Sequence, residues 1–267
     1  MEKKLPVYDL YGTAFLVDVD LLELRQKDNP DNTISILDME DKGTHYLVLY
    51  DKIAKKQLPF EPDNIDPNHI VAAIVPPLKE LDAEGMASRY GCPVQDMAGK
   101  TDYEIMVDQD TLMRRLAGEL PQTRIYGDTF YFDWRLKELR AKDDLQANPL
   151  KFKNMAMNSD GTAYICAYHI PTKSEYHIDV SATKLPENVV FLEIPYELKF
   201  DPVGVAREYG LEDTALLRRF PIPKVIEVKV TPLSETELPM IIAANLKKAQ
   251  TEKQEQQPQE RKGKKIK

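Results

Sequence analysis

The sequence predicts an α+β protein made of two tandem copies of one mainly antiparallel β-sheet module, each with about two helices, followed by a disordered basic C-terminal tail. Three observations predict this architecture: a long internal repeat, strand-like alternation of apolar residues in both copies, and a terminal segment almost without aliphatic residues. We place the modules at residues 1–118 and 119–250, and the tail at residues 251–267.

The internal repeat is the strongest signal in the chain. Residues 5–28 align with residues 120–143 at an offset of 115, and 12 of these 24 positions are identical. Collinear blocks follow at offsets of 118 and 119, ending at Gly91 and Gly210. Because the offset grows by only four residues over the whole alignment, we infer two copies of one module.

Each module begins with a short strand, residues 5–10 in the first copy, which ends at a Tyr-Gly turn. The next run alternates apolar and other residues, which predicts a strand with one buried face. The alternating positions are Phe15, Val17, Val19 and Leu21 in the first copy and Phe130, Phe132, Trp134 and Leu136 in the second. We expect Asp18 and Asp133, which interrupt these runs, to face outward or to cap the bend at the end of the strand.

Two more strands and a helix follow in each copy. Residues 46–50 and 164–168 alternate again, whereas the nearly continuous apolar runs at 70–75 and 189–194 are typical of strands covered on both faces. Short helices are predicted over 82–90 and 201–209, because an Asp begins each and a Gly follows each.

We expect each module to close with a strand and a helix. In the first module these are residues 102–107 and 109–117, and in the second they are residues 224–231 and 238–250. The last helix carries apolar residues at helical spacing and lysines in its final turn.

Charge is unevenly distributed along the chain. The formal net charge is -8, and the segments 1–118, 119–250 and 251–267 carry -9, -2 and +3. The acidic body argues against broad nonspecific binding of nucleic acid and favours basic protein partners. The tail offers cations that could contact nucleic-acid phosphates, or it is a solvated terminus; these cations are Arg261, Lys262, Lys264, Lys265 and Lys267.

The chain is predicted to be cytoplasmic. No apolar run approaches the roughly 20 residues that span a bilayer, and the first residues carry no signal-peptide pattern. Cys92 and Cys166 are too few for a disulfide framework and lack zinc-pair spacing, so we predict two reduced thiols, with Cys166 in the core.

The most polar repeated element is Glu-Leu-Arg, which comprises Glu23 and Arg25 in the first module and Glu138 and Arg140 in the second. One interpretation is a contact surface presented twice. The other is that each arginine pairs locally, Arg25 with Asp18 and Arg140 with Asp133, and fixes the strand exit.

No other motif supports a catalytic or cofactor site. His169 and His177 flank a hairpin turn and could hold a divalent metal, but two half-exposed strand residues explain them as well. Gly99-Lys100-Thr101 resembles the end of a phosphate-binding loop, yet Val94 stands where such a loop needs glycine. We therefore predict no catalytic residue, no cofactor and no bound metal.

The pair of motifs at residues 120–143 and 5–28 resembles a group of hypothetical proteins from gut bacteria and their mobile elements. The resembling core, LPxxxIYGxTFYFDxRLxELRxKDD, covers roughly a tenth of the chain. The resemblance implies a bacterial cytoplasm and a phage or conjugative-element context, and it implies no activity.

These observations favour a noncatalytic binding or adaptor protein that presents a repeated surface, or a groove between its modules, to another protein. The shared residues are mostly structural, whereas an enzyme needs a convergent polar constellation. The alternatives are a nucleic-acid-associated or DNA-mimicking accessory factor of a mobile element, and an enzyme of unknown class.

Overall fold

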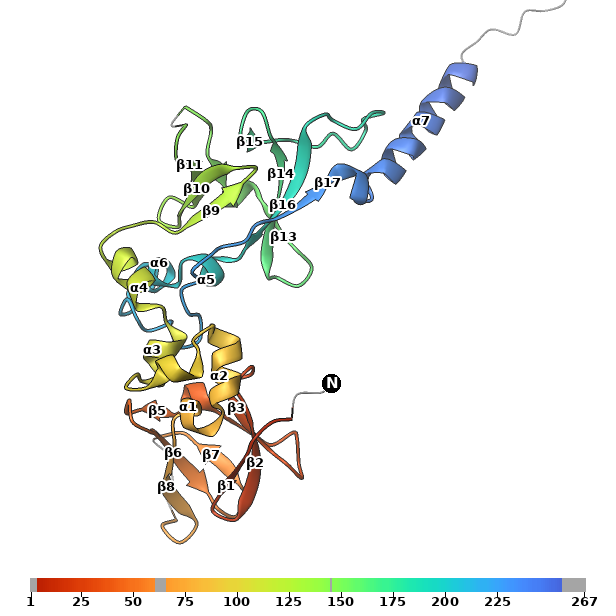
Figure 1. Ribbon diagram of the computed structural model, residues 1–267. Coiled ribbons are helices and arrows are strands. Elements are labelled where there is room, and N and C mark those ends of the chain that lie inside the picture. The colour runs from red at the N-terminus through yellow and green to blue at the C-terminus, as the bar shows by residue number, and fades with distance from the viewer. Residues whose placement is uncertain (1–3, 61–65, 145, 256–267) are drawn as a thin grey trace, which may run out of the picture. The chain divides into compact units, whose positions relative to one another are not determined.

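A computed structural model describes residues 4–60, 66–144 and 146–255 (Figure 1). The fold is mixed α+β, with antiparallel sheets, and the chain forms two compact units. Unit 1 contains the described residues up to Leu116 together with Glu212–Ile222, and unit 2 contains Ala117–Leu211 and the described residues from Pro223 onward. Residues 212–222, which belong to the second half of the sequence repeat, therefore pack within unit 1.

Each unit begins with a four-stranded antiparallel meander. In unit 1 its strands are β1 (Val7–Leu10), β2 (Thr13–Asp18), β3 (Glu23–Gln26) and β4 (Thr33–Ser35). In unit 2 they are β9 (Gln122–Ile125), β10 (Asp128–Asp133), β11 (Glu138–Ala141) and β12 (Leu150–Lys151). The registers agree at an offset of 115: Tyr8 lies opposite Phe15, and Thr123 lies opposite Phe130.

The first hairpin turn explains the repeated Tyr-Gly pair. Tyr11 and Gly12 have φ of 51° and 79°, and Tyr126 and Gly127 have φ of 50° and 86°. A two-residue turn with both central residues at positive φ matches the right-handed twist of the flanking strands, and glycine adopts that conformation without steric cost.

A second antiparallel sheet follows the meander in each unit. In unit 1 it consists of β5 (Glu40–Asp41), β6 (Tyr46–Asp51), β7 (Lys56–Leu58) and β8 (Ile70–Val75). In unit 2 it consists of β13 (Ala156–Met157), β14 (Ala163–His169), β15 (Ser174–Glu175), β16 (Val189–Pro195) and β17 (Lys229–Pro232). Single 3-10 turns lead into these sheets, η1 (Ile36–Asp38) and η3 (Phe152–Asn154).

A helix pair follows β8 and β16; the second helix of each pair confirms the one predicted at 82–90 or 201–209, and the first was not predicted. The pairs are α1 (Leu78–Leu81) with α2 (Ala83–Tyr90), and α5 (Glu197–Phe200) with α6 (Pro202–Glu208). The N-cap Asp82 accepts a hydrogen bond from the Gly85 amide at 2.9 Å, and Asp201 accepts one from Gly204 at 2.9 Å. A Cβ at either glycine would lie 2.0 or 2.2 Å from the capping carboxylate, so the cap itself requires glycine there.

The expected closing strand of the first module is wrong. Residues 102–106 form helix α3 (Asp102–Met106), which follows the 3-10 turn η2 (Val94–Met97). A capping box begins α3: the Glu104 amide donates to Thr101 Oγ1 at 3.2 Å, and the Thr101 amide donates to Glu104 Oε2 at 2.7 Å. The predicted helix after it is confirmed as α4 (Gln109–Leu116).

The structure decides two expectations about strand faces. Of the two alternatives for Asp18, capping of the bend is confirmed: the buried carboxylate accepts a hydrogen bond from the Leu21 amide at 3.1 Å. Strand β8 is not covered on both faces, because Ala72 and Ile74 are exposed whereas Ala73 and Val75 are buried.

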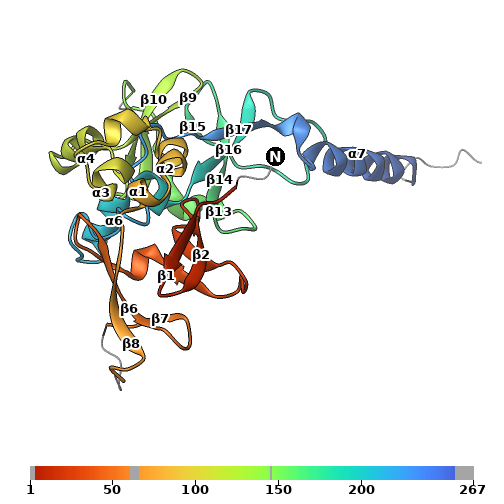
Figure 2. The ribbon, with the colours of Figure 1, turned by 60° about the horizontal axis from the view of Figure 1, so that its bottom comes forward.

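The C-terminal part of unit 2 forms β17, the 3-10 turn η4 (Leu233–Glu235) and the long helix α7 (Leu238–Glu255) (Figures 1 and 2). The predicted strand at 224–231 is shorter than expected and starts at Lys229. Residues 251–255, expected in the disordered tail, continue α7, since this stretch has good helix formers and no proline or glycine. The five tail cations proposed to contact nucleic acid lie outside the described residues.

Candidate functional site

In unit 2 the second sheet is covered by the chain's own C-terminal segment. Strand β17 pairs antiparallel with β16, so that Phe191 lies opposite Thr231 and Glu193 lies opposite Lys229. The Lys229 ammonium is 2.8 Å from the Glu193 carboxylate. β17 therefore occupies the edge of β16 that β14 leaves open.

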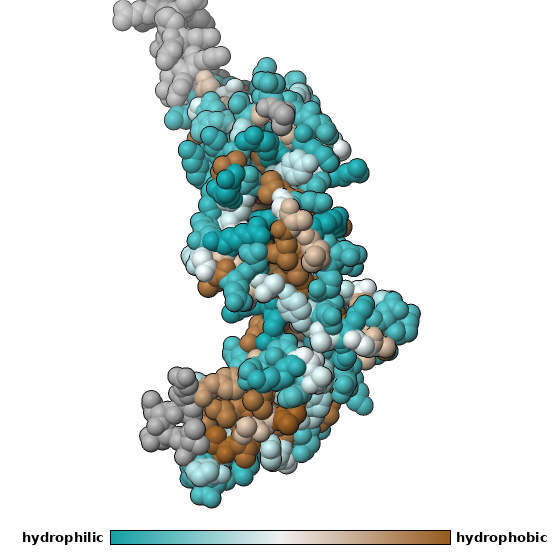
Figure 3. Space-filling view, turned by 90° about the vertical axis from the view of Figure 1, so that its left-hand side faces the viewer, coloured by the Kyte–Doolittle hydropathy of each residue, from teal (hydrophilic) through white to brown (hydrophobic). Residues whose placement is uncertain are grey.

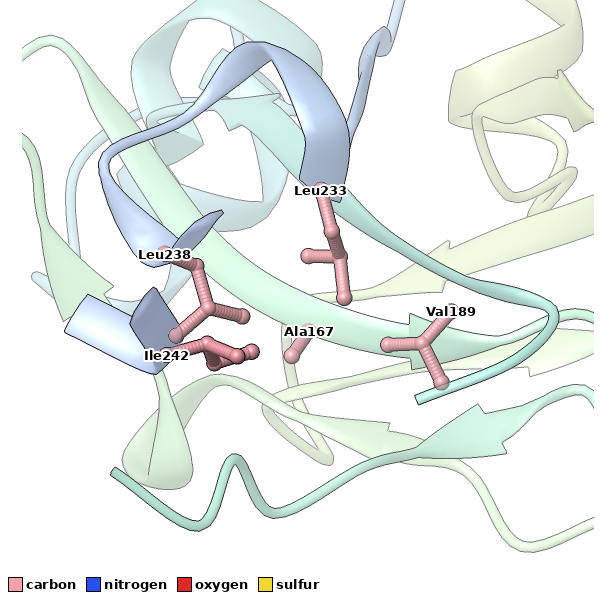
Figure 4. Close-up of a cluster of buried hydrophobic side chains, with 5 residues drawn as sticks. All are labelled: Ala167, Val189, Leu233, Leu238 and Ile242. Carbon is pink, nitrogen blue, oxygen red and sulfur yellow. The ribbon is translucent and has the colours of Figure 1, made fainter. Parts of the chain in front are cut away.

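The chain after β17 then covers the outer face of the same sheet. A buried cluster joins sheet residues to the covering segment (Figure 4); its members are Ala167, Val189, Leu233, Leu238 and Ile242. Phe191 and Ile178 pack against this cluster. The strand, the 3-10 turn and the first turns of α7 thus form one continuous cover for β14 and β16.

Unit 1 has no such cover within its described residues. Strand β8, the counterpart of β16, pairs only with β6, because the chain continues into α1, α2, α3 and α4 and forms no further strand (Figure 1). The Lys52 amide donates to the His69 carbonyl at 2.9 Å, so His69 faces β6. Along an antiparallel strand, residues whose backbone N–H and C=O groups point toward the neighbouring strand alternate with residues whose groups point away from it. The backbone groups of Ala72 and Ile74 therefore point away from β6. We call this row of groups the open edge.

The Tyr8 side chain reaches the open edge. The Tyr8 hydroxyl donates a hydrogen bond to the Ile74 carbonyl at 3.3 Å. Partial burial, and then the negative charge of Asp9, raise the pKa of this phenol. In unit 2 the equivalent residue is Thr123, and its hydroxyl donates at 2.6 Å to the carbonyl of Ile226, in the segment that leads into β17. The same strand position therefore contacts the sheet edge in unit 1 and the covering chain in unit 2.

The sheet face beside the open edge is apolar. Register places Leu47 opposite Ile74 and Leu49 opposite Ala72, and side chains at these positions share the outer face. We call this surface the open face; its residues are Leu47, Leu49, Ile70, Ala72 and Ile74. Ile74 is 61% exposed. In the space-filling view, apolar side chains gather in a continuous brown area on unit 1, at the lower end of the picture (Figure 3).

The Glu-Leu-Arg elements occupy equivalent places, in β3 and β11, and each arginine is locally paired. Arg25 pairs with Asp18, as the local interpretation predicts, and also lies 3.5 Å from Glu23. Arg140 pairs with Glu138 and not with Asp133, so that part of the prediction is wrong. Asp133 accepts a hydrogen bond from the Leu136 amide at 3.0 Å and thus caps the bend. The proposed contact surface formed by these elements stays a prediction.

The histidine and cysteine candidates do not converge. His169 Nδ1 lies 2.8 Å from the Thr172 hydroxyl, and the described residues contain no group of three or more His, Cys, Asp or Glu placed to hold a metal ion. Cys166 is buried, and burial together with nearby Glu175 raises the pKa of its thiol to about 12. This thiol is therefore protonated at neutral pH.

Unit 2 also contains an open groove of about 1010 Å³ between β9 and the segment that precedes β17. Four of its lining side chains are basic and one, Glu227, is acidic; the basic ones are Arg124, Lys142, Lys224 and Lys229. A groove with this charge suits an anionic ligand. Sequence reasoning missed this groove because its basic residues are scattered over more than 100 positions.

Sequence reasoning also missed the open face. Its signal was present, because the apolar residues at 70–75 form an unbroken run. Such a run predicts a strand covered on both faces, which describes β16 in unit 2 but not β8 in unit 1.

Comparison with family models, curated proteins and solved structures finds no match to this chain. Among the described helices, none has both the length and the apolar character needed to cross a membrane.

Proposed function

We propose that this chain is a noncatalytic protein-binding or adaptor protein, built by duplication of one α+β module, in which unit 1 holds a protein partner. Equal registers, equal hairpin turns and equal Asp-Gly helix caps at matching positions support the duplication. The observation that carries the function is that one sheet is covered in unit 2 and open in unit 1.

Physical chemistry supports a role for the open surface. An unpaired strand edge beside exposed apolar side chains is an aggregation hazard unless a partner covers it. Ile74 stands where unit 2 has Glu193, so unit 1 presents an apolar group at a position where a charge would protect the edge. Burial of such a side chain contributes roughly 1.5–3 kcal/mol to binding.

Affinity capture tests this function. The full chain, immobilised, is incubated with a lysate of the organism that encodes it, and retained proteins are identified by mass spectrometry. Baits are the wild type, Ile74→Lys and the matched control Leu21→Lys, whose leucine is 62% exposed and lies in the bend between β2 and β3, outside the second sheet. We expect one partner to bind the wild type and Leu21→Lys and to be lost with Ile74→Lys. Equal capture by all three baits would contradict the proposal.

The same capture tests the Glu-Leu-Arg surface. If these elements bind the partner, Arg25→Ala and Arg140→Ala baits recover less of it. Unchanged recovery would limit both arginines to the local ion pairs described above.

The basic groove favours a second candidate function, binding of nucleic acid by unit 2. Its test is the salt dependence of binding to a fluorescently labelled DNA duplex, measured for the wild type and for Arg124→Ala combined with Lys142→Ala. If both side chains contact phosphates, the plot of log affinity against log salt concentration becomes less steep in the variant, and the magnitude of its negative slope decreases by about 2. The same measurement on a chain that ends at Glu255 distinguishes binding by this groove from binding by the tail cations.

A further inference from the structure

Unit 2 contains a template for the kind of segment that covers this sheet. An extended strand runs antiparallel to the edge of β16, a 3-10 turn comes next, and the first turns of a helix then pack on the outer face (Figure 4). Leu238 and Ile242, four positions apart on α7, pack on that face together with Leu233. The cover is therefore one short strand–turn–helix segment.

We propose that the open edge and open face of unit 1 bind a strand–turn–helix segment of another protein. The inference rests on the proposed function and names the partner's structural class. The partner's strand pairs antiparallel with β8 and receives the backbone groups of Ala72 and Ile74. Its helix places apolar residues, at a spacing of four, on the open face. This is the strand-addition mode of recognition combined with packing of an amphipathic helix.

Residue differences between the units define the partner's chemistry. Ile74 replaces Glu193, so a lysine at the position of Lys229 would lose its ion partner, and we expect an uncharged residue there. Unit 1 has a net charge of -9 over residues 1–118, and Glu212–Ile222 contributes two acidic and two basic residues. The partner segment is therefore expected to carry a net positive charge.

The same differences disfavour a second copy of this chain as the occupant. The cross-strand pair Leu49–Ala72 stands where unit 2 has Ala167–Phe191, so the large and small side chains are exchanged. The C-terminal segment of another copy packs against Ala167 in its own unit 2. On unit 1 it would meet the larger Leu49 side chain at that position. Donating it would also expose the cluster around Val189.

Tyr8 fits this role. Its hydroxyl holds the Ile74 carbonyl in the absence of a partner, while its counterpart Thr123 contacts the covering chain itself. A bound strand would replace the tyrosine at that carbonyl, and the phenol would become free to contact the incoming backbone.

The test uses the full-length chain and a phage-displayed library of peptides patterned on residues 227–250, randomised at positions that contact the sheet. Selected peptides are synthesised, and their affinity is measured by fluorescence anisotropy. The unmodified 227–250 peptide is the control. Hydrogen exchange reports protection of the Ala72 and Ile74 amides in the complex.

We expect selected peptides to carry an uncharged residue in place of Lys229 and to bind about tenfold or more tightly than the control peptide. Ile74→Lys should weaken their binding by about tenfold or more, and Leu21→Lys should leave it unchanged. The amides of Ala72 and Ile74 should exchange more slowly in the complex.

Three results would overturn the inference. These are failure of the library to yield binders, binding that leaves both amides unprotected, and a homodimer of the wild type that Ile74→Lys dissociates. If lysate capture still depends on Ile74 in such a case, the proposed function stands and only the partner class is wrong. If capture is independent of Ile74, both fail.

Discussion

Units 1 and 2 each contain a four-stranded meander, a second antiparallel sheet and a helix pair, but they differ in the segment after that pair. Unit 2 returns to its second sheet with β17 and α7 and covers it. Unit 1 continues into α3 and α4, and among its described residues the edge of β8 stays without a strand. The comparison teaches that a sheet packed on one face only keeps an unpaired strand edge and an exposed apolar face unless a further segment covers them.

The units also use different groups at equivalent points of the core. Tyr46 and Tyr164 are equivalent, and each hydroxyl donates to a carboxylate, Asp102 at 2.7 Å and Glu197 at 2.6 Å. Glu197 belongs to the helix that follows β16. Asp102 instead comes from α3, so unit 1 has made its additional helix part of the core.

Asp102→Ala should have the largest effect. The buried Asp102 carboxylate accepts hydrogen bonds from Tyr46 and from the amides of Leu78 and Lys79, at 2.5 and 3.1 Å for the amides. Removing it leaves these donors unsatisfied at the start of α1, and we expect a loss of about 3–5 kcal/mol in the stability of unit 1. Hydrogen exchange of β6 amides measures this loss.

The control for this prediction is Asp110→Ala, which removes an exposed carboxylate from α4 and should change stability by no more than about 0.5 kcal/mol. Trp134, the only tryptophan of the chain, reports on unit 2 through its fluorescence. A large shift of the Trp134 transition in Asp102→Ala would show that the effect is not specific to unit 1.

The second prediction compares the covered and the open sheet directly. Leu233→Ala removes a buried side chain, 4% exposed, from the cover of unit 2, and should cost about 2–4 kcal/mol. Ile74→Ala removes an exposed side chain from the open face, and should cost no more than about 0.5 kcal/mol. Urea unfolding followed by Trp134 fluorescence measures the first, and hydrogen exchange of β8 measures the second. Equal costs would mean that the two faces are covered alike.

Much of the shared fold could be predicted from the sequence, because its signals are local. Alternation identified most of the strands, and an Asp at the start with a Gly after the end identified α2 and α6. The strand predicted at 102–107 failed because its apolar residues fit either period, and the deciding signal is the Thr101–Glu104 capping box.

The candidate site depends on long-range packing, which a repeat cannot reveal. Residues 70–75 and 189–194 look alike in sequence, yet only the second run receives β17. Likewise, the Arg218 guanidinium donates to the Ile36 carbonyl at 2.8 Å, although Arg218 lies in the second half of the repeat. Such pairings are determined by the path of the whole chain.

The third prediction tests a feature that the units share. Glycine to alanine in a helix usually stabilises by about 1 kcal/mol. At Gly85 and Gly204 the sign should reverse, with a loss of about 1–2 kcal/mol in each unit, because the new Cβ would displace the capping carboxylate. Ser88→Ala, on the exposed side of α2, is the control and should be neutral. Stabilisation in either glycine variant would argue against equivalent caps.

The smallest expected effect concerns the link between the second helix of each pair and the first sheet. In unit 2 Glu208 accepts hydrogen bonds from Trp134 and Lys137, both at 2.6 Å. The equivalent position in unit 1 is Arg89, whose guanidinium donates to the Val19 carbonyl. The linking side chain is a carboxylate in unit 2 and a guanidinium in unit 1. The contribution of each link to the stability of its unit should therefore depend differently on pH.

The bond from Lys137, followed by that from Trp134, lowers the pKa of Glu208 below its usual value of 4.5. A lowered carboxyl pKa stabilises the folded state above pH 4.5, and this contribution is lost as pH falls through the folded-state pKa. Glu208→Gln should therefore cost about 0.5 kcal/mol at pH 7, a small figure because the carboxylate is 43% exposed, and the cost should vanish in acid. Arg89→Ala should show no such pH dependence, because the guanidinium stays charged throughout. The stability cost of each variant is measured between pH 3 and 7, by Trp134 fluorescence for unit 2 and by hydrogen exchange for unit 1. Equal pH profiles of the two costs would show that the two links are electrostatically alike.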